Sequence, residues 1–407
     1  MSKNDNDIVV VSFARTAFDR FGGVTKNIPS SDLASWVIAE LVKRSGLPSE
    51  AVDDVNLGQC ILGEAWTQSD IIGRQALIKA GLREETISNN IDRACCSSTS
   101  ALQLSWKNLM LGEAELSIAV GVDNMGRAPY YLPPERRWDG QRIGDMKLID
   151  KLMNLGYAGF GVLAVDAGEV ALEYGITREM QDEWAERSHA LWGEADSKGY
   201  FKEEIFPVEI SQGKTKPPII FDRDQQPRPG TTVETLAKLP TANGSPTVTA
   251  GNAPGLNTGS AGVMVTTRKK AQELGLEPLA TVLRVASIAL KPRQIAVAPA
   301  PAIQKGLELT GLKLDDIKLI EINEAFAAMP LVATKILGDG DEAKIKKLRD
   351  ITNVNGGAVA MGHPVGASGL RITMTLIAEL RRRGGGYGVA SICGGLAQGD
   401  AVILKVD

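Results

Sequence analysis

Two adjacent cysteines, Cys95 and Cys96, make up half of the four cysteines in this chain of 407 residues. Cys95 follows a segment typical of a strand, 88–94, and precedes a segment typical of a helix, 98–113. The free N–H groups and positive dipole end of a helix N-terminus lower a thiol's pKa and favour the nucleophilic thiolate. Cys95 is therefore a candidate nucleophile, although a small buried cysteine would fit the position equally well. We expect Cys96 to be buried, because adjacent side chains cannot share one direction.

One of the chain's two histidines lies in a glycine-rich stretch. His363 occurs in "NVNGGAVAMGHPVGASG", where glycines permit close backbone approach and Pro364 favours an extended conformation at His363. Such a histidine could accept the proton of a thiol as a general base, although a hydrogen-bonded structural histidine is the alternative. His189 lies on a highly charged helical segment, so we expect it at the surface.

Further polar groups follow strand-like segments. Cys393 comes after "YGVASI" and before two glycines whose N–H groups could stabilise an oxyanion. Asn323 and Glu324 end "IKLIEI", and polar residues at strand ends of an α/β sheet face the ligand crevice. Asn323 could instead cap the next helix. We place Cys60 in a strand, within "LGQCILGEA", and interpret it as core packing, and no cysteine–histidine spacing resembles a metal site.

The elements that must position these residues alternate between strand-like and helical patterns, which predicts an α/β fold. In the helical segment 30–47, Ser31 or Ser30 could serve as the N-cap and Gly46 as the stop. Charged, aromatic and proline-bearing stretches dominate the middle of the chain instead. We therefore expect an N-terminal α/β half at 1–125, an inserted helical and loop domain at 126–248, a return to the N-terminal half at 249–276 and a C-terminal α/β half at 277–407.

The two α/β halves show a repeated pattern. Residues 45–57 resemble 310–319, and the helix and strand of 100–122 resemble those of 368–392, in the same order. This indicates two five-stranded layered units that pack as a pseudo-dimer. A cleft at their junction would draw residues from both halves.

Composition narrows the classes of partner. The net charge is −4 without a long basic block, which argues against nucleic acid or membrane attraction. No apolar run approaches the roughly 18 residues of a membrane span. The polar start lacks the basic and apolar regions of a secretory signal. Four cysteines do not form a disulfide framework, so we expect a reduced, cytoplasmic protein.

Over nearly its whole length the chain resembles the thiolases, acyl-CoA acyltransferases that make or cleave 3-ketoacyl-CoA. The resemblance rests above all on "DRACCSSTSAL", "EINEAFAA", "NVNGGAVAMGHPVGASG" and "SICGG", in this order. It implies a duplicated five-layered αβαβα fold with an inserted loop domain covering the coenzyme A site. It also implies coenzyme A and acyl-CoA as substrates, no bound cofactor or metal, a homodimer or homotetramer, and a place in fatty acid metabolism such as β-oxidation.

The resemblance assigns roles to the candidate residues. Cys95 is the nucleophile that forms an acyl-enzyme, with Cys96 as its small neighbour. His363 accepts the thiol proton, and Cys393 removes an α-proton from the second acyl-CoA.

The resemblance also assigns two oxyanion holes and two substrate contacts. His363 and a water held by Asn323 form one oxyanion hole, and the N–H groups of Cys95 and Gly395 form the other. Arg228 matches an arginine beside the adenine of coenzyme A, although it could equally be a surface charge. Phe326 is expected to contact the substrate.

Several positions depart from the family pattern. Val162 and Leu163 stand where many thiolases have histidine and methionine, Pro254 replaces a serine, and Ile295 replaces a methionine. The glycine triplet after Cys393 is interrupted. These changes predict a reshaped acyl pocket that suits a bulkier or different acyl group.

Two alternatives remain open. Related condensing enzymes commonly pair one cysteine with two histidines or with histidine and asparagine, whereas here a second cysteine, Cys393, favours a thiolase. A non-catalytic acyl-CoA-binding subunit is the other alternative, against which the intact Cys95, His363 and Cys393 argue.

Overall fold

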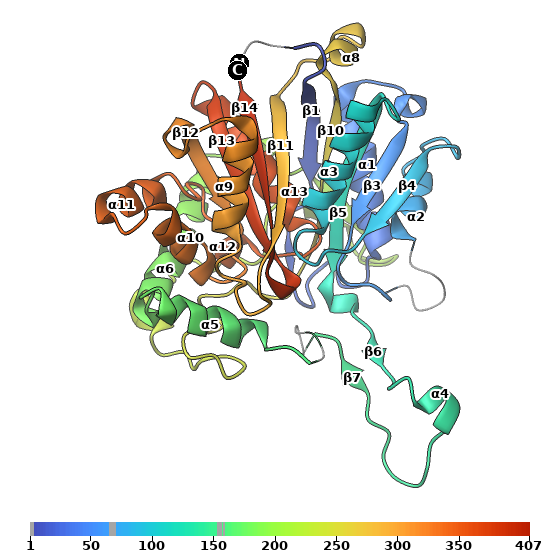
Figure 1. The fold of residues 1–407 in the computed structure, drawn as a ribbon. Coiled ribbons are helices and arrows are strands. Elements are labelled where there is room, and N and C mark those ends of the chain that lie inside the picture. The colour runs from blue at the N-terminus through green and yellow to red at the C-terminus, as the bar shows by residue number, and fades with distance from the viewer. Residues whose placement is uncertain (1–3, 65–70, 153–156, 158) are drawn as a thin grey trace.

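A computed structural model describes residues 4–64, 71–152, 157 and 159–407. A mixed sheet runs through its centre and divides into two halves (Figure 1). The strand order is β4-β3-β5-β10-β1 in the first half and β11-β14-β13-β12 in the second. The halves join where β1 pairs with β11, at Val9↔Thr281 and Val10↔Ala280. The alternating segments therefore form an α/β fold, as predicted.

The pairing pattern is repeated between the halves. In the first, β5 pairs parallel with β3 and antiparallel with β10; in the second, β13 pairs parallel with β12 and antiparallel with β14. The strands are β1 (Ile8–Arg15), β2 (Asp19–Arg20), β3 (Asp54–Gly58), β4 (Ile87–Ile91), β5 (Leu116–Asn124), β10 (Asn257–Thr267), β11 (Ala280–Ala289), β12 (Ile317–Ile322), β13 (Gly386–Gly394) and β14 (Gln398–Val406).

The expectation of five strands in each half is wrong for the second half. Where β4 would have its counterpart, the described residues form only a bridge between Ile320 and Thr352. Asn353 follows with a φ of 50°, a left-handed conformation that ends any extended run.

Helices cover the outer face of each half and fill the space between the halves. α1 and α2 pack on the first half, α9 and α10 on the second, while α3 and α13 pack against each other and against strands of both. This gives the αβαβα layering visible in Figure 1. The bounds are α1 (Ser30–Ser45), α2 (Ile72–Lys79), α3 (Ser97–Leu111), α8 (Arg268–Glu273), α9 (Pro299–Thr310), α10 (Ala328–Leu337), α11 (Glu342–Asp350), α12 (Ala358–Met361) and α13 (Ser368–Arg382).

The apolar pattern of β1 explains how one strand serves two layers. Val9 and Val11 join the core cluster beneath α1, whereas Ile8 and Val10 join the cluster around α3 and α13. Successive strand side chains point to opposite faces, so a continuous apolar run marks a strand covered on both sides.

The middle of the chain leaves the sheet and forms a peripheral layer with a protruding arm (Figure 1). The arm runs through β6 (Tyr130–Tyr131), α4 (Arg136–Asp139) and β7 (Ile149–Asp150). The rest contains α5 (Leu163–Glu173), α6 (Arg178–Ser197), β8 (Val208–Ile210), β9 (Ile219–Phe221) and α7 (Val233–Leu236). β10 then returns to the first half between β1 and β5.

The start of α1 differs from the prediction. Pro29 is the N-cap, and Ser30 lies inside the helix, where its backbone N–H and its hydroxyl both donate to the buried carboxylate of Glu64. This long-range partner replaces the local cap that the sequence suggested. Gly46 ends the helix in a left-handed conformation with φ 69°, as predicted.

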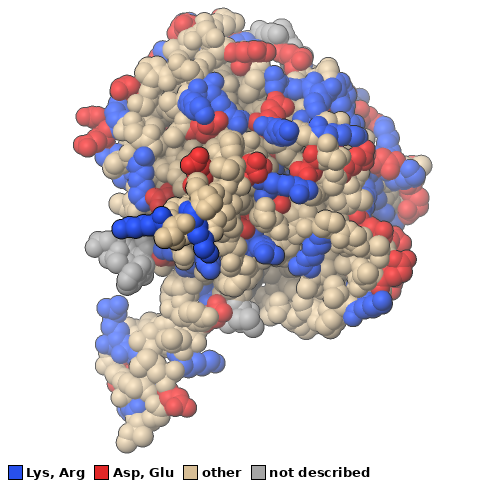
Figure 2. Space-filling view, turned by 180° about the vertical axis from the view of Figure 1, so that it is seen from behind, with Lys and Arg blue, Asp and Glu red and all other residues tan. Residues whose placement is uncertain are grey.

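On the face shown in Figure 2, acidic and basic side chains are interspersed. None of the helices within the described residues is long and apolar enough to cross a membrane.

Candidate active site

Cys95 lies in a tight turn between β4 and α3. The preceding residue, Ala94, has a φ of 52°, which is uncommon for a residue with a side chain. Ser97 locks the turn, because its Oγ accepts from the Arg93 N–H at 2.9 Å and donates to the Ala94 carbonyl at 2.6 Å. Backbone strain of this kind persists only where surrounding contacts impose it. The turn that these contacts fix places Cys95 at the junction of the two halves.

Cys96 faces a different direction from Cys95. It is fully buried, and its Sγ lies 3.7 Å from the carbonyl oxygen of Ile392 in β13. A Cβ added to Gly394 would lie 2.8 Å from the same sulfur. Cys96 therefore packs between α3 and β13, whereas Cys95 keeps part of its surface accessible.

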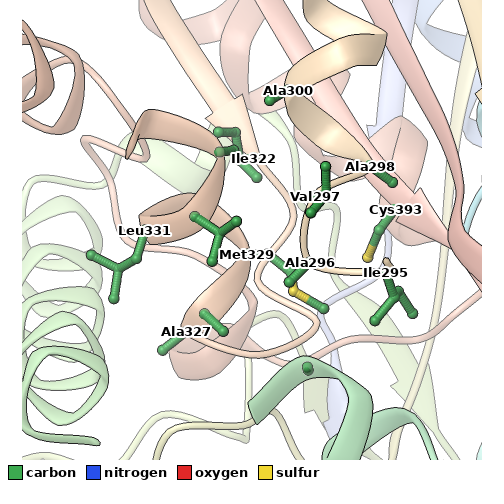
Figure 3. Packing of buried hydrophobic residues seen from close by; sticks show 14 of the residues in the cluster. Ile295, Ala296, Val297, Ala298, Ala300, Ile322, Ala327, Met329, Leu331 and Cys393 are labelled. Carbon is green, nitrogen blue, oxygen red and sulfur yellow. The ribbon is translucent and has the colours of Figure 1, made fainter. Parts of the chain in front are cut away.

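Cys393 stands at the end of β13 and is fully buried. Figure 3 shows it beside the segment 295–298, which leads into α9. Burial raises the pKa of the Cys393 thiol to about 12. A Cβ added to the next residue, Gly394, would lie 3.1 Å from the Arg93 carbonyl oxygen, so the end of β13 abuts the turn that carries Cys95.

His363 is held in one tautomer by its neighbours. Its Nδ1 lies 2.5 Å from Ser368 Oγ, and this hydroxyl donates to the Pro364 carbonyl at 2.9 Å, so Nδ1 must carry the proton. The Nδ2 of Asn323 lies 3.4 Å from Nε2. Burial, and secondarily the charge of Arg371, lower the pKa of His363 to about 3. The neutral ring thus offers Nε2 as a proton acceptor.

The Asn323 amide is oriented by a buried ion pair. Arg371 Nη2 donates to Asn323 Oδ1 at 3.3 Å, while its Nη1 contacts Glu321 at 3.3 Å. Nδ2 therefore points toward His363. The alternative that Asn323 caps the next helix is wrong, because the N-cap of α10 is Ala327.

Glu324 does not face the same space as Asn323. Its buried carboxylate accepts hydrogen bonds from Trp184 Nε1 and Ser188 Oγ of α6, both at 2.8 Å, and from the Val359 N–H at 3.0 Å. Glu324 therefore ties the peripheral helix to the glycine-rich loop that carries His363.

Two residues differ from their predicted surroundings. Cys60 is not in a strand: β3 ends at Gly58, and Cys60 lies half-buried in the next turn, in an apolar cluster that Cys95 also contacts. His189 is only partly exposed, and its Nδ1 accepts from the backbone N–H of Arg228 at 3.3 Å. Both contacts join segments far apart in the chain, which local patterns do not reveal.

The remaining predicted residues occupy separate places. Gly395 is buried directly after β13, and Leu396 follows with φ 57° where a glycine would be unstrained. Phe326 is partly buried two residues before α10, and Arg228 is exposed beside His189. Within the described residues, no group of three histidine, cysteine or acidic side chains could hold a metal ion.

Asp123, near the end of β5, was not among the residues predicted from the sequence. This buried carboxylate accepts from the Ile61 N–H at 2.8 Å, the Cys60 N–H at 3.2 Å and the Gly366 N–H at 2.5 Å. It thus fastens the loop after His363 to the turn that holds Cys60. Burial raises the pKa of Asp123 to about 7. A polar residue at a strand end was the available signal.

The pKa of Cys95 contradicts the sequence-based expectation. Burial raises it well above that of an ordinary thiol, and Cys393 and Asp123 raise it further, against the lowering expected from the helix N-terminus alone. At neutral pH Cys95 is therefore a thiol, and His363 is a neutral imidazole.

This predicts how Cys95 reacts with iodoacetamide. Because only the thiolate reacts, the labelling rate should rise about tenfold per pH unit between pH 6 and 9 without a plateau. Peptide mass spectrometry after timed quenching measures the rate. A rate independent of pH below 7 would instead reveal a preformed thiolate–imidazolium pair.

The family models that match this chain are those described as the thiolase N-terminal domain, over residues 8–269, and the thiolase C-terminal domain, over residues 276–406. Acetyl-CoA acetyltransferase from Syntrophomonas wolfei subsp. wolfei is 40% identical, over 98% of this chain and 99% of its own length. The corresponding enzyme of Cupriavidus necator is 41% identical, over 98% of this chain and 99% of its own length.

Solved structures agree with these sequence matches. The Bacillus anthracis acetyl-CoA acetyltransferase superposes with a TM-score of 0.91 at 38% identity, covering 98% of this chain and 99% of that one. Human mitochondrial 3-ketoacyl-CoA thiolase in complex with CoA gives 0.91 at 33% identity, with 100% of both chains covered. With two domain models, full-length relatives and this superposition in agreement, the chain belongs to the thiolase family.

Proposed function

We propose that Cys95 carries the acyl group in a two-step acyl transfer, as the activity of a thiolase requires. The Cys95 sulfur attacks an acyl-CoA thioester while its proton passes to Nε2 of His363. The thioester bond to coenzyme A breaks, and Cys393 gives its proton to the departing CoA thiolate. The observation that carries this proposal is the meeting of the Cys95 turn, the end of β13 with Cys393 and the His363 loop at the junction of the two halves.

In the second step the Cys393 thiolate removes an α-proton from acetyl-CoA. The resulting carbanion attacks the acyl carbon on Cys95, a carbon–carbon bond forms, and the Cys95 sulfur leaves and regains its proton from His363. The product is a 3-ketoacyl-CoA, and the reverse sequence is thiolysis by coenzyme A. A high thiol pKa supports this role, because its thiolate is the stronger base.

We assign two oxyanion holes that stabilise the transient oxyanions. Nε2 of His363, once protonated, and a water held by Asn323 would form the first and bind one thioester oxygen. The N–H groups of Cys95 and Gly395 would form the second and bind the other thioester oxygen. The fixed amide of Asn323 and the buried position of Gly395 support these assignments.

Coenzyme A would lie against the region 126–248. Arg228 supports this placement, because it is exposed and next to the partly buried His189 on this layer. Phe326, three residues after Asn323, would contact the acyl or pantetheine portion.

Mass spectrometry of the intact protein tests the function. Wild type mixed with acetyl-CoA should gain one acetyl group, mapped by peptide analysis to Cys95, and Cys95→Ala should gain none. Absence of an adduct on the wild type would favour the non-catalytic acyl-CoA-binding subunit.

The protein's surface further supports self-association. β4 is an open sheet edge on which Ile87 is 66% exposed. The arm also exposes apolar side chains, which a monomer rarely leaves in contact with water. These are Tyr130, Tyr131, Leu132, Trp138, Ile143, Met146, Leu148 and Ile149. We propose that second copies of this chain cover both surfaces, giving dimers through β4 that pair into tetramers through the arm.

Light scattering during gel filtration checks this assembly. The wild type should elute as a tetramer of the 43.4 kDa chain, and the double variant Trp138→Glu, Ile143→Glu should elute as a dimer, because charges on the arm oppose its burial. A wild type that elutes at 43.4 kDa would contradict the proposal.

A further inference from the structure

Tyr157 belongs to the peripheral region, yet its side chain reaches the catalytic junction. A Cβ added to Gly395 would lie 1.7 Å from the Tyr157 hydroxyl oxygen and 2.5 Å from Cζ. The hydroxyl end of the ring therefore rests directly against the backbone of Gly395, whose N–H the mechanism uses.

The pKa of the same hydroxyl is raised above that of an ordinary tyrosine. Burial is the first cause that raises the pKa of Tyr157, and Cys60 and Cys95 are the next. The residue is 37% exposed, and the hydroxyl end of its ring is the part that lies against Gly395. Tyr157 thus remains a neutral O–H group between solvent and the nucleophile.

The other walls around Cys95 are apolar and close. Cys95 and Cys60 pack against a small cluster formed by Ile61, Met125 and Val365. An acyl group on Cys95 would therefore have this cluster on one side and, toward Gly395, the tip of Tyr157. A long acyl chain that extends toward Gly395 would have to displace the tyrosine.

We propose that Tyr157 determines acyl-chain specificity by closing the acyl site beside Gly395. This proposal rests on the proposed acyl transfer through Cys95. The site then accepts an acetyl or similarly short acyl group and excludes long chains. Tyr157 supplies side-chain bulk at a site where smaller or aliphatic residues such as Val162 and Ile295 were expected to leave space. Its contribution is steric, so the ring matters more than the hydroxyl.

Three variants separate the contribution of the Tyr157 ring from that of its hydroxyl. Tyr157→Ala removes the ring, Tyr157→Val is a second truncation in case alanine perturbs folding, and Tyr157→Phe removes only the hydroxyl. Tyr387→Ala is the matched control, because Tyr387 lies six residues before Cys393 in the same strand, about 20 Å away at 3.3 Å per residue.

The readout is the ratio of kcat/KM for thiolysis of 3-ketodecanoyl-CoA to that of acetoacetyl-CoA. Tyr157→Ala and Tyr157→Val should raise this ratio at least about tenfold, since each added methylene in a matched pocket already discriminates by that order. Tyr157→Phe and Tyr387→Ala should leave the ratio within about threefold of the wild type.

An unchanged ratio in folded Tyr157→Ala and Tyr157→Val would overturn the proposal. That failure is distinct from failure of the proposed function, because acetylation of Cys95 is measured on the same wild-type sample. A missing acetyl adduct on Cys95 would contradict the proposed acyl transfer. A normal adduct together with an unchanged kcat/KM ratio would contradict only the role of Tyr157.

Discussion

Cys95→Ala should lower kcat/KM for thiolysis of acetoacetyl-CoA by at least about a thousandfold, the order seen when a covalent nucleophile is removed. Without the Cys95 sulfur no acyl-enzyme forms, and neither half of the reaction has an alternative carrier. The loss is measured as the rate at which acetyl-CoA forms from acetoacetyl-CoA and coenzyme A, monitored by chromatography.

The neighbouring thiol provides the control for this prediction. Cys96→Ala should keep kcat/KM within about threefold of the wild type, because Cys96 contacts β13 and the variant loses only one buried sulfur. Circular dichroism establishes that both variants fold. A large loss of turnover in folded Cys96→Ala would mean that the wrong cysteine was assigned as the nucleophile.

The sequence predicted the elements around the site well because their apolar patterns are strong. The continuous apolar run of β1 and the helical pattern of residues 98–113 are local features, and each corresponds to an observed element. The order of Cys95, His363 and Cys393 along two similar halves also predicted a shared junction. What brings them together, however, is tertiary packing between α3 and α13.

Three of the errors share one physical cause, which is partners distant in sequence. Ser30 bonds to Glu64 instead of capping its helix. Cys60 leaves its strand because Asp123 binds the N–H groups of the next turn. The raised pKa of Cys95 follows from enclosure by both halves, which outweighs the helix N-terminus. None of these partners is encoded by spacing along the chain.

Tyr157 was missed for a related reason. The region 126–248 has few regular patterns, and Tyr157 and Gly395 lie 238 positions apart. An aromatic residue in an irregular segment normally predicts surface or satellite packing. Only the placement of its tip against Gly395 connects it with the reaction.

Cys393→Ala should separate the two halves of the reaction. Cys393 is the proposed base for the α-proton, so thiolysis and condensation should fall by at least about a thousandfold, while acetyl-CoA should still acetylate Cys95 within about tenfold of the wild-type rate. Water or His363 can protonate the departing CoA thiolate in its place, and this explains the modest loss in the first step.

Two measurements on the same sample test this separation. Intact mass follows the acetyl adduct, and deuterium uptake into the methyl group of acetyl-CoA in D₂O follows α-proton removal, which the variant should lose. Cys96→Ala, the other fully buried thiol at this junction, should retain both. If Cys393→Ala lost the adduct as well, Cys393 would be needed for the first acyl transfer, and the base for the α-proton would have to be sought elsewhere.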